Sequence, residues 1–280
     1  MINIIFFIIL VLLVIFYPSN LNIEYINKKT GKELFESDEF RQIMNDYQKK
    51  EIYYISNKRI VDGDRKKLVE LFLDSIIQPD NEQKKRMEYL CKKANKILIG
   101  IFGTSIDWKF LLWKNNLYWD FYITIKDVIV ISDYEMGFIM KERDSYGVSF
   151  LVHEAFHIFQ KGIMKDIFEE IYVGMNFVKK NIKNILWQNK FIKENWITNP
   201  DGLNGEWLYE TDKDYICPLL LMDENGNHSK YYVRLDKNMR MGKIGKLSDC
   251  EEYNVFGKIW QSYHPNEIFG SYIQSQVNKN

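Results

Sequence analysis

The sequence predicts a mixed α+β fold, and three patterns along the chain support this class. Apolar residues recur with helical spacing between residues 32 and 96. Two β-rich runs, residues 119–125 and 128–132, are separated by only Lys126 and Asp127, which suits paired strands. Two further apolar runs, residues 217–222 and 231–235, flank a turn-forming segment and predict a hairpin. Together these patterns favour an α+β domain with a small sheet.

The remaining elements are taken in chain order. Residues 32–96 predict two or three amphipathic helices whose charged residues form a solvated outer face. A helix of about sixteen residues is expected to begin at an N-cap of Asp144 or Ser145 and to end at Gly162. Another helix is expected from about residue 166 to residue 178. Pro265 suits the first position of a C-terminal helix that runs to about residue 277.

Composition excludes several classes of protein. With 280 residues, 46% of them hydrophobic, the chain can bury a core, which excludes disorder as its main state. The 38 basic residues cancel the 38 acidic ones, so no basic excess points to a nucleic-acid partner. Three cysteines without a Cys-x-x-Cys spacing predict neither a disulfide framework nor a thiolate metal site. Three cysteines do not indicate whether the protein works in an oxidising or a reducing compartment.

The first residues predict an attachment to a membrane. Residues 2–17 contain only one polar residue, Asn3, and are followed directly by Pro18. The run lacks a basic flank and small residues at its end, which favours an uncleaved anchor over a signal peptide that would give a secreted protein. Lys28, Lys29 and Lys32 would favour a cytoplasmic body, but a lone N-terminal segment also commonly exports the rest of its chain. We expect an extracytoplasmic body; a buried core segment at the N-terminus is the alternative.

One motif carries chemistry. Residues 153–157 read His-Glu-Ala-Phe-His, and such a match is rare by chance in a chain with four histidines. Residues four apart on a helix lie on one face, so His153 and His157 can bind one ion, while Glu154 projects beside it toward a bound water. Because the surrounding residues are apolar, these polar groups would be buried, at a cost of about 1–3 kcal/mol each without partners. Zinc fits this donor set best; the alternative is a pair of core histidines bonded to backbone carbonyls.

A catalytic zinc needs a third protein ligand. A histidine six residues after His157 is excluded because that position is Ile163, and Gln160 stands where such a pattern needs glycine. The contenders are glutamates on a second helix, Glu267 or the pair Glu206 and Glu210. A small residue one turn after the ligand lets two helices approach, and only Glu267 has one, Gly270. The spacing therefore favours Glu267.

These residues resemble a known family. His-Glu-x-x-His at 153–157 and Asn266-Glu267-Ile268-Phe269-Gly270-Ser271 look like the paired motifs of the gluzincin group of zinc metallopeptidases, typified by thermolysin-like enzymes. The resemblance implies a zincin-like catalytic domain in which His153, His157 and Glu267 bind Zn²⁺ and Glu154 acts as general base. It covers only two short motifs. Thermolysin-like enzymes orient a histidine with an aspartate four residues after the ligand glutamate, where this chain has Ser271. Either another carboxylate takes that task or the third ligand is a residue other than Glu267.

The expected function is zinc-dependent hydrolysis of peptide bonds in a peptide or protein substrate. Tyr263 and His264 are candidate donors to the oxyanion, although either can be structural. Residues 128–131 could be an edge strand that pairs with an extended substrate, as gluzincin folds imply. Gln160 could orient a ligand or lie exposed at the helix end. The alternative function is a membrane-anchored zinc-binding or interaction protein without peptidase activity.

The predicted organisation has three parts. Residues 1–19 form the membrane anchor or signal segment, residues 20–99 a helical N-terminal region, and residues 100–280 the metallopeptidase domain.

Overall fold

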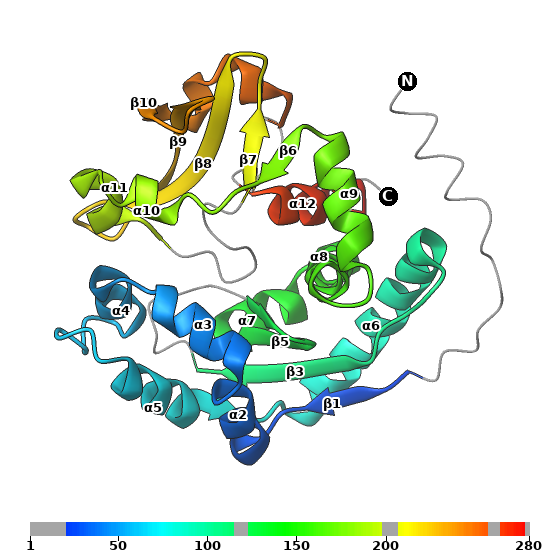
Figure 1. Cartoon of the computed structure of the whole chain (residues 1–280). Coiled ribbons are helices and arrows are strands. Elements are labelled where there is room, and N and C mark those ends of the chain that lie inside the picture. Colours follow the sequence, from blue (N-terminus) through cyan, green and yellow to red (C-terminus); the bar gives the residue numbers. More distant parts are fainter. Residues whose placement is uncertain (1–20, 115–122, 198–206, 257–263, 278–280) are drawn as a thin grey trace.

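The part of the chain that the structure describes contains two five-stranded sheets, one in a lower lobe and one in an upper lobe (Figure 1). The structure is a computed structural model that describes residues 21–114, 123–197, 207–256 and 264–277. Helices cover the lower sheet and lie beside the upper one (Figure 1). The predicted α+β class is therefore confirmed.

The lower sheet is mixed, with the strand order β1-β3-β5-β4, and β2 pairs with the end of β3. β1, β3 and β5 run parallel, and β4 is antiparallel to β5. The pairing predicted for β4 and β5 is confirmed in the part of the chain that the structure describes. The expectation of an edge strand at residues 128–131 is wrong, because β5 lies between β3 and β4. Among the described strands, β4 lies at the edge of the sheet next to β5, and β1 lies at the other edge. The strands are β1 (Ile23–Tyr25), β2 (Ile76–Ile77), β3 (Trp108–Trp113), β4 (Ile123–Ile125) and β5 (Val128–Ser132).

Both faces of the lower sheet are buried, and the side chains of β5 alternate between them. Val128 and Val130 join the apolar cluster of the N-terminal helices, whereas Ile129 and Ile131 join the cluster of α6 and α8. The helices of the lower lobe are α2 (Lys28–Phe35), α3 (Asp38–Asp46), α4 (Lys49–Ile55), α5 (Arg65–Ser75), α6 (Asn81–Phe102), α7 (Asp133–Lys141) and α8 (Asp144–Lys161).

The N-terminal region contains more elements than the two or three helices predicted from its periodicity. Asn27, Ser37, Asp64 and Asp80 each accept a hydrogen bond from a backbone amide of the first turn and so begin a new helix. Such caps divide the region into several short helices and one long helix, α6. β1 and β2 bring this region into the same sheet as β3, β4 and β5. The predicted boundary at residues 99 and 100 stays a prediction.

Helix α8 lies between α6 and the upper lobe (Figure 1). It ends at Gly162 as predicted, and its N-cap is Arg143, one residue before the expected range. Asp144 in the first turn accepts hydrogen bonds from Arg86, Tyr89 and Lys93 of α6. These donors hold the pKa of the Asp144 carboxyl well below its usual range. Asp144 therefore ties the start of α8 to α6 across the pH range in which proteins usually work.

The upper sheet is antiparallel, with the strand order β10-β9-β8-β7-β6. The predicted hairpin is confirmed, because β8 and β9 pair along their whole length from Asp214 with Asp236 to Met222 with His228. The strands are β6 (Phe177–Lys179), β7 (Trp207–Glu210), β8 (Asp214–Met222), β9 (His228–Asp236) and β10 (Met241–Lys246). The helical elements are α9 (Lys165–Gly174), α10 (Lys183–Leu186), α11 (Lys190–Asn195), the 3₁₀ turns η1 (Leu247–Asp249) and η2 (Glu251–Phe256), and α12 (Pro265–Val277).

Among the described residues, the two lobes contact each other on two sides of the molecule. On one side α12 packs against α8, with Pro265 at its first position as predicted (Figure 1). On the other side Lys50 of α4 donates to the Asn195 side chain at 2.7 Å and to the Met222 carbonyl at 3.0 Å. Tyr54 of α4 also donates to the carbonyl of Glu224 in the β8–β9 turn. The packing of α12 on α8 places the candidate site where the lobes join.

Within the described ranges, no helix is both long and apolar enough to cross a membrane. The predicted anchor, residues 2–17, lies outside these ranges, so the anchor stays a prediction.

Candidate metal centre

Helices α8 and α12 bring three buried side chains together. His153 and His157 lie one turn apart on α8, and their Nε2 atoms are 3.1 Å apart. Glu267 lies in the first turn of α12, and its Oε2 is 3.5 Å from His153 Nε2 and 3.7 Å from His157 Nε2. His153, His157 and Glu267 thus form a buried group that could hold one metal ion.

The geometry of this group suits zinc. A triangle with these three sides leaves a point about 2 Å from each donor atom, and Zn–N and Zn–O bonds are about 2.0–2.2 Å long. Two imidazoles and a carboxylate form the donor set of known catalytic zinc sites. All three side chains are at most 3% exposed. An ion there would therefore be bound by buried side chains of the chain itself.

Gly270 allows α12 to approach α8 this closely. A Cβ at this position would lie 2.8 Å from both Cε1 and Nδ1 of the His153 ring. Real Cβ atoms do not come so near to other heavy atoms, so the ring or the helix would have to move. The close approach expected from a small residue one turn after Glu267 is therefore present.

Glu154 lies beside the three donor atoms rather than among them. Its side chain is fully buried, and its Oε2 accepts a hydrogen bond from the Thr124 hydroxyl at 2.9 Å. Its Oε1 is 3.9 Å from His153 Nε2. The hydroxyl of Thr124, on edge strand β4, therefore holds Oε2 of Glu154. Oε1 of Glu154 faces the group formed by His153, His157 and Glu267. Lys161, at the end of α8, also donates to the Thr124 carbonyl.

Sequence reasoning missed Thr124, although a polar residue in an apolar run gave a signal. Burial inside such a run requires a hydrogen-bond partner for the hydroxyl, but the sequence does not identify that partner.

Gln160 contacts the second histidine. Its side chain is only 5% exposed, its Oε1 is 3.0 Å from His157 Nδ1, and its Nε2 donates to the Asn266 carbonyl at 3.0 Å. Of the two predicted alternatives, the exposed glutamine at the helix end is wrong.

Ser271 stands one turn after Glu267, and its buried hydroxyl finds no hydrogen-bond partner among the described residues. An amide of α8, rather than another carboxylate, thus contacts His157.

Tyr172 of α9 is a further buried polar residue near the group, and sequence reasoning missed it too. It packs against Phe269 of α12, with ring centroids 5.9 Å apart. Burial raises the pKa of the Tyr172 hydroxyl; a hydrogen bond with Gln160 opposes this rise, and the nearby charge of Glu267 adds to it. The phenol therefore stays protonated and adds no charge to the centre.

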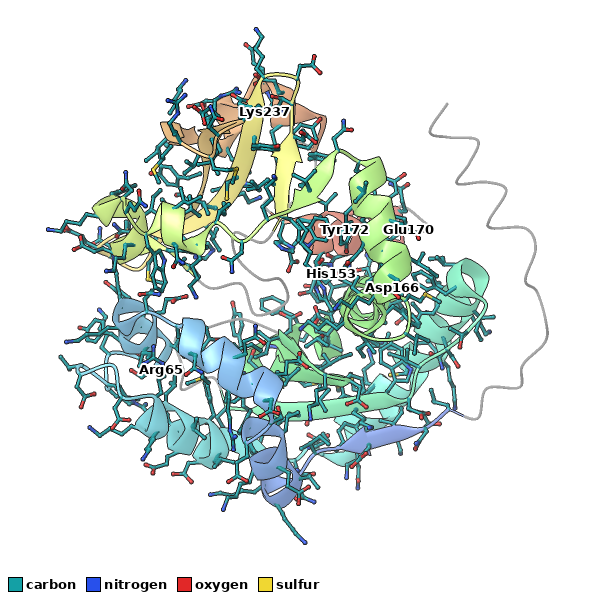
Figure 2. All side chains as sticks on the ribbon, in the orientation of Figure 1. Arg65, His153, Asp166, Glu170, Tyr172 and Lys237 are labelled. Atoms are coloured by element: carbon teal, nitrogen blue, oxygen red, sulfur yellow. The ribbon has the colours of Figure 1, made fainter. Side chains whose placement is uncertain are left out.

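The other candidate residues are not among the three donors or lie outside the described residues. The His264 ring is buried, and its Nδ1 accepts a hydrogen bond from the Asn266 amide at 3.1 Å, at the start of α12. Glu210 of β7 pairs with Lys237 at 2.8 Å. Figure 2 shows Lys237 at the far end of the upper sheet from His153, so Glu210 is not a ligand. Tyr263 and Glu206 lie outside the described residues.

Comparison of the chain with protein-family models, with curated proteins and with solved structures finds no match. The functional argument therefore depends on the residues of the metal centre themselves.

Proposed function

We propose that this protein is a zinc-dependent peptidase of the gluzincin type. The observation that carries the proposal is the buried group of His153, His157 and Glu267 with the Glu154 carboxylate directly beside it. Two imidazoles and two carboxylates so deeply buried are costly without a cation, and a divalent ion compensates them together. A structural zinc site has no need of a buried carboxylate that does not bind the metal, so Glu154 favours hydrolysis over a purely structural site.

The number of ligands also favours catalysis. Within the described residues the group offers three ligands, and catalytic zinc sites keep their fourth position for water or substrate. Bound there, Zn²⁺ supplies a Lewis acid and a water of lowered pKa.

The residues around the centre have distinct proposed roles. Glu154 Oε1 accepts the proton of the attacking water and passes it to the leaving amine, while Thr124 holds Oε2 in place. Since Nδ1 of His264 accepts a hydrogen bond, the neutral ring carries its proton on Nε2, which makes Nε2 the candidate donor to the oxyanion. Tyr263 is the other proposed donor. The edge strand β4, which holds Thr124, is the proposed place where an extended peptide adds to the sheet.

The proposed location depends on residues 2–17. We propose that this segment anchors the chain in a membrane and that the catalytic part lies outside the cytoplasm.

Removal of the metal tests the proposed function. The purified protein is expected to cleave an unstructured substrate such as casein, to lose this activity after dialysis against a chelator, and to regain it with one equivalent of Zn²⁺. Peptide fragments are measured by mass spectrometry. Zinc binding without cleavage would support the alternative of a zinc-binding protein. Undiminished cleavage after complete metal removal would contradict the proposal.

A further inference from the structure

Gln160 bridges the two helices that form the metal centre. It lies on α8, three residues after His157, and its amide reaches the backbone of α12 at Asn266, the residue before Glu267. The side chain is almost fully buried, so both of its polar ends need partners, and both have them. The amide of Gln160 thus contacts the candidate ligand His157 directly. It also contacts the backbone of α12, the helix that carries the candidate ligand Glu267.

The contact with Asn266 fixes which way the amide points. A backbone carbonyl can only accept a hydrogen bond, so the atom of Gln160 that faces it must be the NH₂ group. The Oε1 atom is then the one that faces His157 at 3.0 Å, and because it can only accept, Nδ1 of His157 must carry the proton. A flipped amide would instead place two oxygens against each other at Asn266.

The protonation of Nδ1 has a consequence for the metal. In a neutral imidazole only one nitrogen carries a proton, so Nε2 of His157 keeps its lone pair. Nε2 is the atom that lies 3.1 Å from His153 Nε2 and 3.7 Å from Glu267 Oε2. The hydrogen bond therefore orients the ring with its free lone pair toward the other two donors.

We propose that Gln160 is a positioning residue that sets the tautomer and ring orientation of His157 for metal binding. This role rests on the proposed zinc site. It also links the ring to the start of α12 through the Asn266 carbonyl. Gln160 is not one of the three proposed ligands, and its contacts with His157 and with the backbone beside Glu267 are those through which it acts on the site.

Two variants of the full chain test the role. Gln160→Met has similar length but only a weakly accepting sulfur and no donor, and it is expected to weaken Zn²⁺ binding by about 10–100-fold. Gln160→Glu keeps an acceptor for the Nδ1 proton but places a second oxygen against the Asn266 carbonyl, so its Zn²⁺ affinity is expected to lie between those of wild type and Gln160→Met. Affinity is measured by competition with a chromophoric chelator. The visible spectrum of the Co²⁺-loaded protein provides a second readout, and it is expected to change in Gln160→Met alone.

A matched control separates this role from general stability. Gln78→Met removes an amide that also donates to a backbone carbonyl, that of Ile26 at 3.0 Å, and it is expected to leave Zn²⁺ affinity and the Co²⁺ spectrum unchanged. The role is overturned if Gln160→Met keeps wild-type affinity and spectrum, or if Gln160→Glu loses as much affinity as Gln160→Met. If the wild type itself binds no zinc, the metal site and the role of Gln160 are both overturned. If the wild type binds zinc and only the variants behave otherwise than expected, the role of Gln160 alone is overturned.

Discussion

Replacement of Glu154 by glutamine is expected to leave one zinc bound per chain while lowering kcat for peptide hydrolysis by about 10²–10⁴-fold. Glutamine has the same shape, and its carbonyl oxygen can still accept the hydrogen bond of the Thr124 hydroxyl. The amide cannot take a proton from water, so the general base is lost while the three proposed ligands stay. Zinc content is measured by elemental analysis, and cleavage by the rate of fragment release.

The control for this change is another buried carboxylate. Glu135 of α7 accepts a hydrogen bond from the Tyr146 hydroxyl at 2.7 Å, which resembles the contact of Glu154 with Thr124. Glu135→Gln is therefore expected to keep full activity. Hydrolysis by Glu154→Gln at a rate close to that of wild type would show that Glu154 is not the base.

Substitution of Gly270 by alanine is expected to weaken zinc binding by about 10–100-fold, without any change in a ligand. The new methyl group would lie 2.8 Å from two atoms of the His153 ring, so the ring must turn or α12 must move away from α8. Either shift opens the group of three donors. Zinc affinity by chelator competition, together with thermal unfolding of the metal-free protein, measures the effect.

Gly137 provides the matched control for this prediction. It lies inside helix α7, and a Cβ there would have no neighbour within 4 Å. Gly137→Ala is expected to leave zinc affinity unchanged and to raise the free energy of unfolding by about 0.5–1 kcal/mol. Wild-type zinc affinity in Gly270→Ala would mean that the close contact with His153 does not shape the centre.

The parts of the site that depend on local spacing could be predicted from the sequence. His153 and His157 lie on one face because a helix repeats every 3.6 residues, and the apolar neighbours of this motif predict its burial. The choice of Glu267 also used a local signal, the glycine one turn later, and the structure places Glu267 beside both histidines. Helix geometry sets which side chains share a face within one helix, and Gly270 was the additional signal for the contact between the two helices.

The parts that depend on distant pairing could not be predicted. The strand order puts β5 in the middle of the sheet, and it depends on contacts of β5 with β3 and of β3 with β1, which lies more than 80 residues earlier. The hydrogen-bond partners of Thr124 and Gln160 likewise lie on other elements of the fold, Glu154 on α8 and Asn266 on α12. Each contact also requires one particular side-chain rotamer. The sequence left Gln160 with two interpretations, and only the packing of α12 on α8 decides between them.

X-ray absorption at the zinc edge of the purified wild-type chain tests the central claim most directly. The claim is that His153, His157 and Glu267 hold one zinc ion, so the spectrum should show only nitrogen and oxygen neighbours, at about 2.0–2.2 Å. A sulfur neighbour at about 2.3 Å would instead point to one of the buried cysteines Cys91, Cys217 or Cys250 as a ligand. That result, or a chain that binds no zinc, would contradict the account.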